Sequence, residues 1–189
     1  MQEMPAPQLQ AWNCSAVGVF VFYAANCSIG VVAHGGYYTT PPMYGHVILN
    51  GNTVWQSAWA NASIPLSRGV NMMQVNPFTC TLLEPPRQFD TFKLASTQMS
   101  SYLQRLGHGV IVVGVTANEP VRNLQHELPT LNSMGVDVSD VQYGGAFAFV
   151  AQKDFDQKTA LRKTTTIETA ASVETDISVT VTGASQIFI

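Results

Sequence analysis

The sequence predicts a single α+β domain dominated by antiparallel β structure. Two observations predict the strands. Apolar, β-branched runs of strand length recur at 17–23, 110–116 and 146–152. Asn50-Gly51, the strongest two-residue hairpin signal, separates two further short runs. The third observation is apolar spacing typical of helices in two later stretches, at 96–107 and 118–135.

The first third of the chain is predicted to form short strands joined by turns. The run at 17–23 is apolar throughout, which indicates a strand buried on both faces. We expect a turn at 26–28 and a second strand at 29–33. After the Asn50-Gly51 hairpin, residues 58–67 are predicted to form a loop, because they contain Pro65 and polar residues.

The middle of the chain is predicted to form a hairpin and then two helices. Residues 70–75 and 80–83 are the two strands of the hairpin, which ends at Pro85-Pro86 because proline removes ladder donors. The first helix has a cap at Ser96 or Thr97 and one apolar stripe: Met99, Tyr102, Leu103 and Leu106.

The second helix begins at Asn118 as N-cap and ends at Met134-Gly135. We expect Pro129 to kink it or to split its last turn. Its buried stripe contains Val121, Leu124, Leu128 and Leu131. The Thr-rich tail after it alternates apolar and polar residues at 173–181, as in a one-sided strand. This tail is either an extra hairpin on the sheet or a linker to a further domain.

Composition favours a secreted or lumenal protein. Charged residues make up only 11% of the chain, against about 25% in an average protein. The absence of a basic run argues against nucleic acid as a partner. No apolar run approaches the ~20 residues of a membrane span, so no membrane insertion is expected. Residues 1–7 do not resemble a signal peptide, which indicates a mature form or a fragment of a longer chain.

The cysteines and the N-glycosylation sequons also bear on whether the protein is secreted or lumenal. The cysteines are Cys14, Cys27 and Cys80, without zinc-ligand spacing. A Cys14–Cys27 bridge is one hypothesis, and it leaves Cys80 free or bonded to another chain. Three reduced thiols are the alternative. The N-glycosylation candidates are Asn13, Asn26 and Asn61.

No constellation of residues predicts catalysis, a metal site or a cofactor. The histidines share no ligand spacing, and Asp90 is interpreted as a turn or capping carboxylate rather than a catalytic acid. Trp55 and Trp59 lie near a predicted loop, where they are either a sugar platform or loop anchors. We therefore expect a noncatalytic protein.

The order of motifs from Arg68 to Lys153 resembles the ILEI/PANDER domain family. The resemblance rests on Arg-Gly-Val-Asn…Asn-Pro at 68–77, Phe89-Asp90-Thr91, the apolar strand after Gly109, and Phe-Ala-Phe-Val at 147–150. It extends over roughly 14–155. The domain is accordingly predicted at 14–157, between an N-terminal extension at 1–13 and the tail at 158–189.

The resemblance implies two facing, mainly antiparallel sheets with two or three short helices alongside. Family members include secreted cytokine-like proteins, and the stem domain of the protein O-mannose N-acetylglucosaminyltransferase binds sugar without catalysis. Its sugar-site positions correspond here to Arg68, Asn118 and Gly144. This chain departs from the pattern twice: Asn118 replaces an acid, and Gly144 replaces an arginine.

These implications lead to two functional hypotheses. The first is a noncatalytic extracellular recognition module that binds a glycan or a protein receptor. The second is a secreted cytokine-like or self-associating protein, a homodimer linked through Cys80.

Overall fold

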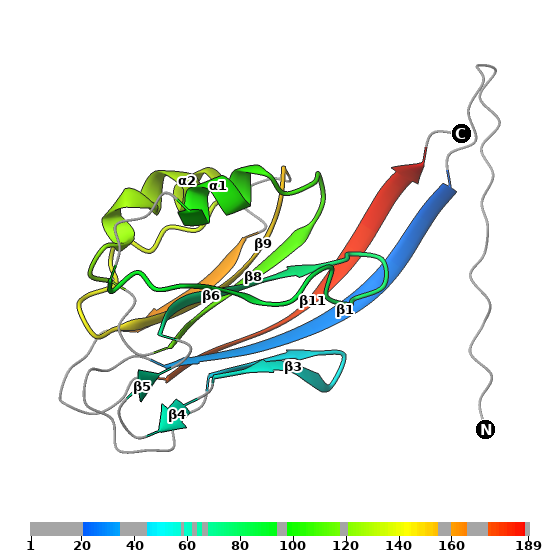
Figure 1. Cartoon of the computed structure of the whole chain (residues 1–189). Helices are drawn as coiled ribbons and strands as arrows, with labels where there is room; N and C mark the ends of the chain where they lie inside the picture. The colour runs from blue at the N-terminus through cyan, green and yellow to red at the C-terminus, as the bar shows by residue number, and fades with distance from the viewer. Residues whose placement is uncertain are drawn as a thin grey trace.

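The fold consists of two facing antiparallel sheets, with short helices on the outer face of one of them (Figure 1). The computed structural model describes residues 21–34, 45–57, 59–61, 64–65, 68–93, 98–117, 121–154, 160–165 and 174–187. All pairings among the described strands are antiparallel. The predicted α+β architecture is therefore confirmed.

The first sheet has the strand order β11-β1-β2-β3. Its members are β1 (Val21–His34), β2 (His46–Leu49), β3 (Asn52–Gln56) and β11 (Glu174–Ile187). The predicted hairpin between β2 and β3 is confirmed, and Asn50 and Gly51 both have positive φ, as its turn requires. Strands β1 and β11 pair along their whole length and extend beyond the rest of the sheet (Figure 1).

The predicted turn at 26–28 is wrong, because β1 continues straight through it. Asn26 lies opposite Thr182 and Ser28 lies opposite Thr180 in the ladder with β11. A partner strand more than a hundred residues away thus overrides the local turn preference of these residues. The predicted loop at 58–67 also contains a small two-stranded sheet, β4 (Trp59–Asn61) and β5 (Ile64–Pro65).

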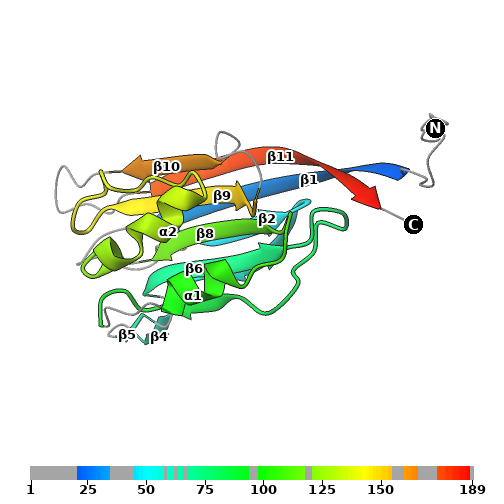
Figure 2. The same cartoon turned by 90° about the horizontal axis from the view of Figure 1, so that it is seen from above.

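The second sheet has the order β10-β9-β8-β6-β7, and Figure 2 shows the helices lying across it. Its members are β6 (Gly69–Val75), β7 (Arg87–Phe89), β8 (Ile111–Ala117), β9 (Ala146–Gln152) and β10 (Leu161–Thr165). The predicted return strand at 80–83 is only a single bridge, between Val75 and Leu82. The tail thus contributes β10 to this sheet and β11 to the other.

Two cores explain the apolar sequence runs. One core fills the space between the second sheet and the helices, and includes Met72, Val112 and Phe149. The other lies between the two sheets. Every residue of β8 is buried, because one face of the strand packs on each core. This accounts for a continuous apolar run in place of an alternating one.

The helices are α1 (Gln98–Gln104), the 3₁₀ turn η1 (Leu124–His126) and α2 (Leu128–Ser133). The predicted stripe of α1 is confirmed, since all four of its apolar residues are buried. The second predicted helix is instead divided into η1 and α2. Pro129 lies in the first turn of α2, where its missing N–H costs no hydrogen bond. Residues 94–97 and 118–120, with the predicted caps Ser96, Thr97 and Asn118, lie outside the described residues.

A disulfide joins Cys27 of β1 to Cys80 of the turn after β6. Both residues are buried in the core between the sheets. The predicted Cys14–Cys27 pairing is therefore wrong, and so is the prediction of a dimer linked through Cys80. Spacing along the chain carried no information about how the turn at 76–80 folds back over β1. Cys14 lies outside the described residues.

Candidate functional site

The predicted site residue Arg68 stands directly before β6, where the chain approaches β7 closely. Gly69 has a φ of +98°, and a Cβ atom placed there would lie 2.2 Å from the Phe89 carbonyl oxygen. It would also lie 2.9 Å from the Thr91 amide nitrogen. Only glycine combines this φ with so close an approach of two backbone segments. The Arg-Gly pair is thus a structural requirement of the β6–β7 contact.

The guanidinium of Arg68 is held by Asp90. Its Nε donates to Oδ1 at 3.0 Å and its Nη2 donates to Oδ2 at 2.8 Å, which is a bidentate ion pair. The guanidinium carbon of Arg68 lies 4.3 Å from the Phe92 ring centroid, and that of Arg122 lies 4.8 Å from it. Because Asp90 occupies two of its nitrogens, Arg68 stabilises this corner of the fold.

Asp90 also closes the turn that follows it, as a turn carboxylate should. Its Oδ1 accepts from the Lys93 amide at 3.3 Å. Burial acts to raise the pKa of Asp90, but the hydrogen bond and charge of Arg68, with two backbone N–H groups, outweigh burial. The pKa therefore lies below the ordinary value of 3.8.

This lowered pKa predicts that Asp90 stabilises the fold at neutral pH and stops doing so in acid. A carboxyl group with a lowered folded-state pKa stabilises above the unfolded value, 3.8 here, and loses that effect as pH falls through the folded value. Asp90→Asn should cost about 1 kcal/mol of unfolding free energy at pH 7. Urea unfolding of both proteins between pH 7 and pH 2 should show the difference shrinking below pH 4.

The matched control is Asp140→Asn, which removes the partner of Arg162 in an exposed ion pair. This change should have little effect at any pH. A difference between Asp90→Asn and the native protein that stays constant down to pH 2 would contradict the assignment.

The other predicted site residues lie in different surroundings. Trp55 is half-buried and packs against the core between the sheets. Gly144 is buried before β9 with a φ of +77°, which explains a glycine at this position. Asn118, Asn13 and the side chains of Trp59, Asn26 and Asn61 lie outside what the structure describes. The structure thus groups Arg68 with Asp90 and Phe92.

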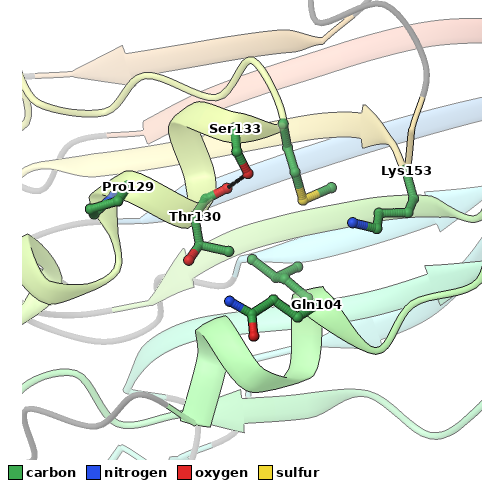
Figure 3. Close-up of a pocket in the computed structure, with 7 residues that line it drawn as sticks. Gln104, Pro129, Thr130, Ser133 and Lys153 are labelled. Carbon is green, nitrogen blue, oxygen red and sulfur yellow. Dashed lines mark hydrogen bonds between the residues drawn. The ribbon is translucent and has the colours of Figure 1, made fainter.

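A groove lies between α1 and α2 (Figure 3), and its volume is about 250 Å³. Gln104 extends from α1 toward α2, and Lys153 extends toward the groove from the end of β9 (Figure 3). Thr130 and Ser133 of α2 line the opposite wall, and Leu103 and Met134 add apolar surface. The groove therefore combines hydrogen-bonding side chains with an apolar surface.

A buried carboxylate connects the two walls of this groove. Glu127 is 1% exposed, and its Oε2 accepts from both the amide and the hydroxyl of Ser100 in α1. Thr130 in α2 donates its hydroxyl hydrogen to Ser100 Oγ at 2.8 Å. The Ser100 amide belongs to the first turn of α1, where N–H groups lack partners within the helix. Glu127 thus caps α1 from the neighbouring element and fixes the spacing of the helices.

Sequence reasoning missed this groove completely. Its polar lining residues Gln104, Thr130, Ser133 and Lys153 belong to three elements and form no motif along the chain. Glu127 lies between the residues of a predicted buried stripe, where a glutamate is ordinarily exposed. Only the packing of α1 against α2 brings these side chains together.

Comparison with known families agrees with this geometry. Residues 68–155 match the ILEI family, described as interleukin-like EMT inducer. Over these residues the chain is similar to the ILEI family. The match begins at the Arg68–Asp90 corner and includes β6 to β9 with both helices, so the groove lies wholly within the matched residues. No curated protein matches the chain.

Two further observations concern all the residues that the structure describes. None of the helices in this part of the chain is long and apolar enough to span a membrane. Among the same residues, no three His, Cys, Asp or Glu side chains gather as metal ligands would.

Proposed function

We propose that this ILEI-like domain is a noncatalytic recognition module that binds a carbohydrate in the groove between α1 and α2. The lining of the groove is the observation that carries the proposal. The Gln104 amide, the acceptor lone pairs of the Thr130 and Ser133 hydroxyls and the Lys153 ammonium group suit the hydroxyls of a sugar, and the apolar surface of Leu103 and Met134 suits its C–H face. The two hydroxyls already donate their hydrogens within the protein, and Lys153 also pairs with Asp154. The Glu127 cap holds the two walls in place before a ligand arrives, which reduces the entropic cost of binding.

We place this activity outside the cell or in the lumen of the secretory pathway. The Cys27–Cys80 disulfide supports the placement, because disulfides persist in oxidising compartments and are rare in the cytosol. The low charge content and the three sequons are consistent with it. The match to an interleukin-like family points the same way.

A glycan array, followed by titration of the best ligand, tests the proposal. Gln104→Leu should weaken binding about fivefold or more, because it removes a hydrogen-bonding wall of the groove. Gln125→Leu is the matched control, since Gln125 is exposed on η1 and does not line the groove. An array blank for every glycan class, or equal affinities for the two variants, would count against the groove.

A second candidate function is cytokine-like binding to a protein receptor. Exposed apolar side chains on the turn after β6 favour it, because Phe78 and Leu83 are 41% and 47% exposed on either side of Cys80. Binding to cells whose surface glycans have been removed enzymatically separates the two functions. Binding that survives this treatment, but is lost in Phe78→Ser/Leu83→Ser, identifies a protein receptor. Tyr143→Ser, at another exposed aromatic residue, is the control.

A further inference from the structure

A second pocket lies on the other flank of α1, next to the edge formed by β6 and β7. Its volume is about 340 Å³, and its lining is almost entirely polar. The lining residues are Gln74, Glu84, Arg87, Tyr102 and Arg105. Tyr102 of α1 and Arg105, which directly follows the helix, line this pocket, whereas Leu103 and Gln104 face the groove between the helices. Helix α1 therefore separates two different sites.

One side of this pocket is already organised by hydrogen bonds. Glu84 accepts from Gln74 Nε2 at 2.9 Å, and Arg87 Nε lies 3.3 Å from the same carboxylate oxygen. The Arg87 guanidinium lies over the Tyr102 ring, 5.3 Å from its centroid. These contacts hold Glu84 and Arg87 in place, and among the described carboxylates only Glu84 pairs with Arg87.

The other side holds Arg105 and Tyr102, whose hydrogen-bonding capacity is only partly used. Arg105 donates from Nε to the Ser101 carbonyl oxygen at 3.1 Å, and no described carboxylate pairs with its guanidinium. The hydroxyl oxygen of Tyr102 is buried and makes no hydrogen bond of ordinary geometry within the described part of the protein, although Gln74 and Glu84 lie close enough to influence its pKa. A buried hydroxyl without a partner is costly and therefore calls for an explanation.

We propose that this pocket binds an acidic sugar residue, one that carries a carboxylate or sulfate group beside free hydroxyls. The anionic group binds between Arg105 and the terminal nitrogens of Arg87, since guanidinium donors match carboxylate and sulfate oxygens in pairs. Glu84 repels a bare anion but accepts from a sugar hydroxyl. The combination of two arginines with one glutamate thus selects an anion that carries hydroxyl donors.

The hydroxyl of Tyr102 completes this site. Burial raises the pKa of Tyr102 to about 12 and outweighs the lowering effect of Gln74, while the nearby Glu84 carboxylate raises the pKa further. The hydroxyl therefore keeps its proton at physiological pH and can donate it to a ligand oxygen. A bound sugar, or a water held with it, offers this hydroxyl an acceptor of good geometry, which the described residues do not provide.

Titration of the ¹⁵N-labelled protein tests the inference, with backbone and arginine Nε–H signals as the readout. The probes are a sulfated heparin disaccharide, a hyaluronan tetrasaccharide, inorganic sulfate and a tetraglutamate peptide. At least one of the two saccharides should shift the signals of Arg87 and Arg105, and that shift should weaken as salt rises. Sulfate and the peptide should bind far more weakly.

Three variants separate a specific site from general attraction. Arg105→Gln should weaken saccharide binding about tenfold or more, because it removes charged hydrogen bonds. Arg122→Gln removes the same charge from an exposed arginine beside Phe92 and should leave binding unchanged. Tyr102→Phe should weaken binding about fivefold while the unfolding midpoint stays constant or rises. If the Tyr102 hydroxyl had only a structural role, Tyr102→Phe would lower the unfolding midpoint and leave saccharide binding unchanged.

Each remaining outcome overturns the inference. If neither arginine signal shifts at up to about 10 mM saccharide, the pocket is excluded as a saccharide site, because weak sites have millimolar affinities. Equal losses in Arg105→Gln and Arg122→Gln reduce the interaction to nonspecific attraction. Inorganic sulfate that binds as well as the saccharide identifies a simple anion site, and equal binding of tetraglutamate identifies a protein partner. None of these results depends on the groove between α1 and α2, so the two proposals can fail separately.

Discussion

Gly69→Ala is expected to lower the free energy of unfolding by about 3 kcal/mol. A φ of +98° is strained for any residue with a side chain, and the added methyl group would meet the Phe89 carbonyl oxygen at 2.2 Å. That oxygen belongs to the backbone of β7, so it cannot move aside as a flexible side chain does. Urea unfolding, followed by tryptophan fluorescence or circular dichroism, measures the loss.

Gly51→Ala is the matched control for Gly69→Ala. Gly51 also has a positive φ, +81°, but a methyl group there would meet nothing within 4 Å. This variant should therefore lose only the conformational part, about 1 kcal/mol. If both variants lost the same unfolding free energy, the close approach of β6 to β7 would contribute nothing to the effect of Gly69→Ala.

Removal of the Cys27–Cys80 disulfide is expected to cost about 4 kcal/mol, from the chain-entropy model of a closed loop. The two cysteines are 53 residues apart in the sequence, so the bond restricts a large part of the unfolded chain. It also joins β1 of one sheet to the turn after β6 of the other. Cys27→Ala/Cys80→Ala should unfold at a much lower urea concentration than the native protein under oxidising conditions.

Two measurements check that this loss belongs to the bond. Native protein in reductant should approach the stability of the double variant, whereas the double variant itself should not respond to reductant. Thiol titration of unreduced, denatured Cys14→Ser should find no free thiol, because its two remaining cysteines are bonded to each other. Two titratable thiols in that variant would contradict the pairing.

Local pattern was enough to predict several elements of the fold. The Asn50-Gly51 hairpin, the buried stripe from Met99 to Leu106 and the helix end at Gly135 all follow from interactions within a few residues. The apolar runs at 110–116 and 146–152 also indicated strands, which the structure has as β8 and β9. Here backbone conformation and side-chain period agree with the final packing, so sequence reasoning succeeds.

Prediction failed wherever a distant partner decides the outcome. The expected turn at 26–28 is a strand because β11 pairs with it, and Cys80 bonds to Cys27 because a turn folds back over β1. The second predicted helix is divided at Glu127, whose carboxylate serves α1 in place of its own helix. In each case contacts across the fold outweigh a local preference of about 1 kcal/mol or less.

The candidate sites show the same division. The sequence by itself placed Arg68, Gly69 and Asp90 in one series of motifs that resembles a known family. The structure supplies the physical reason, because the close β6–β7 approach requires glycine and Asp90 pairs with Arg68. Only the tertiary structure decided that this arginine is occupied by Asp90. The groove and the Arg87–Arg105 pocket likewise exist only after α1 packs on the sheet. Their side chains come from separate elements, and spacing along a chain carries no record of such neighbours.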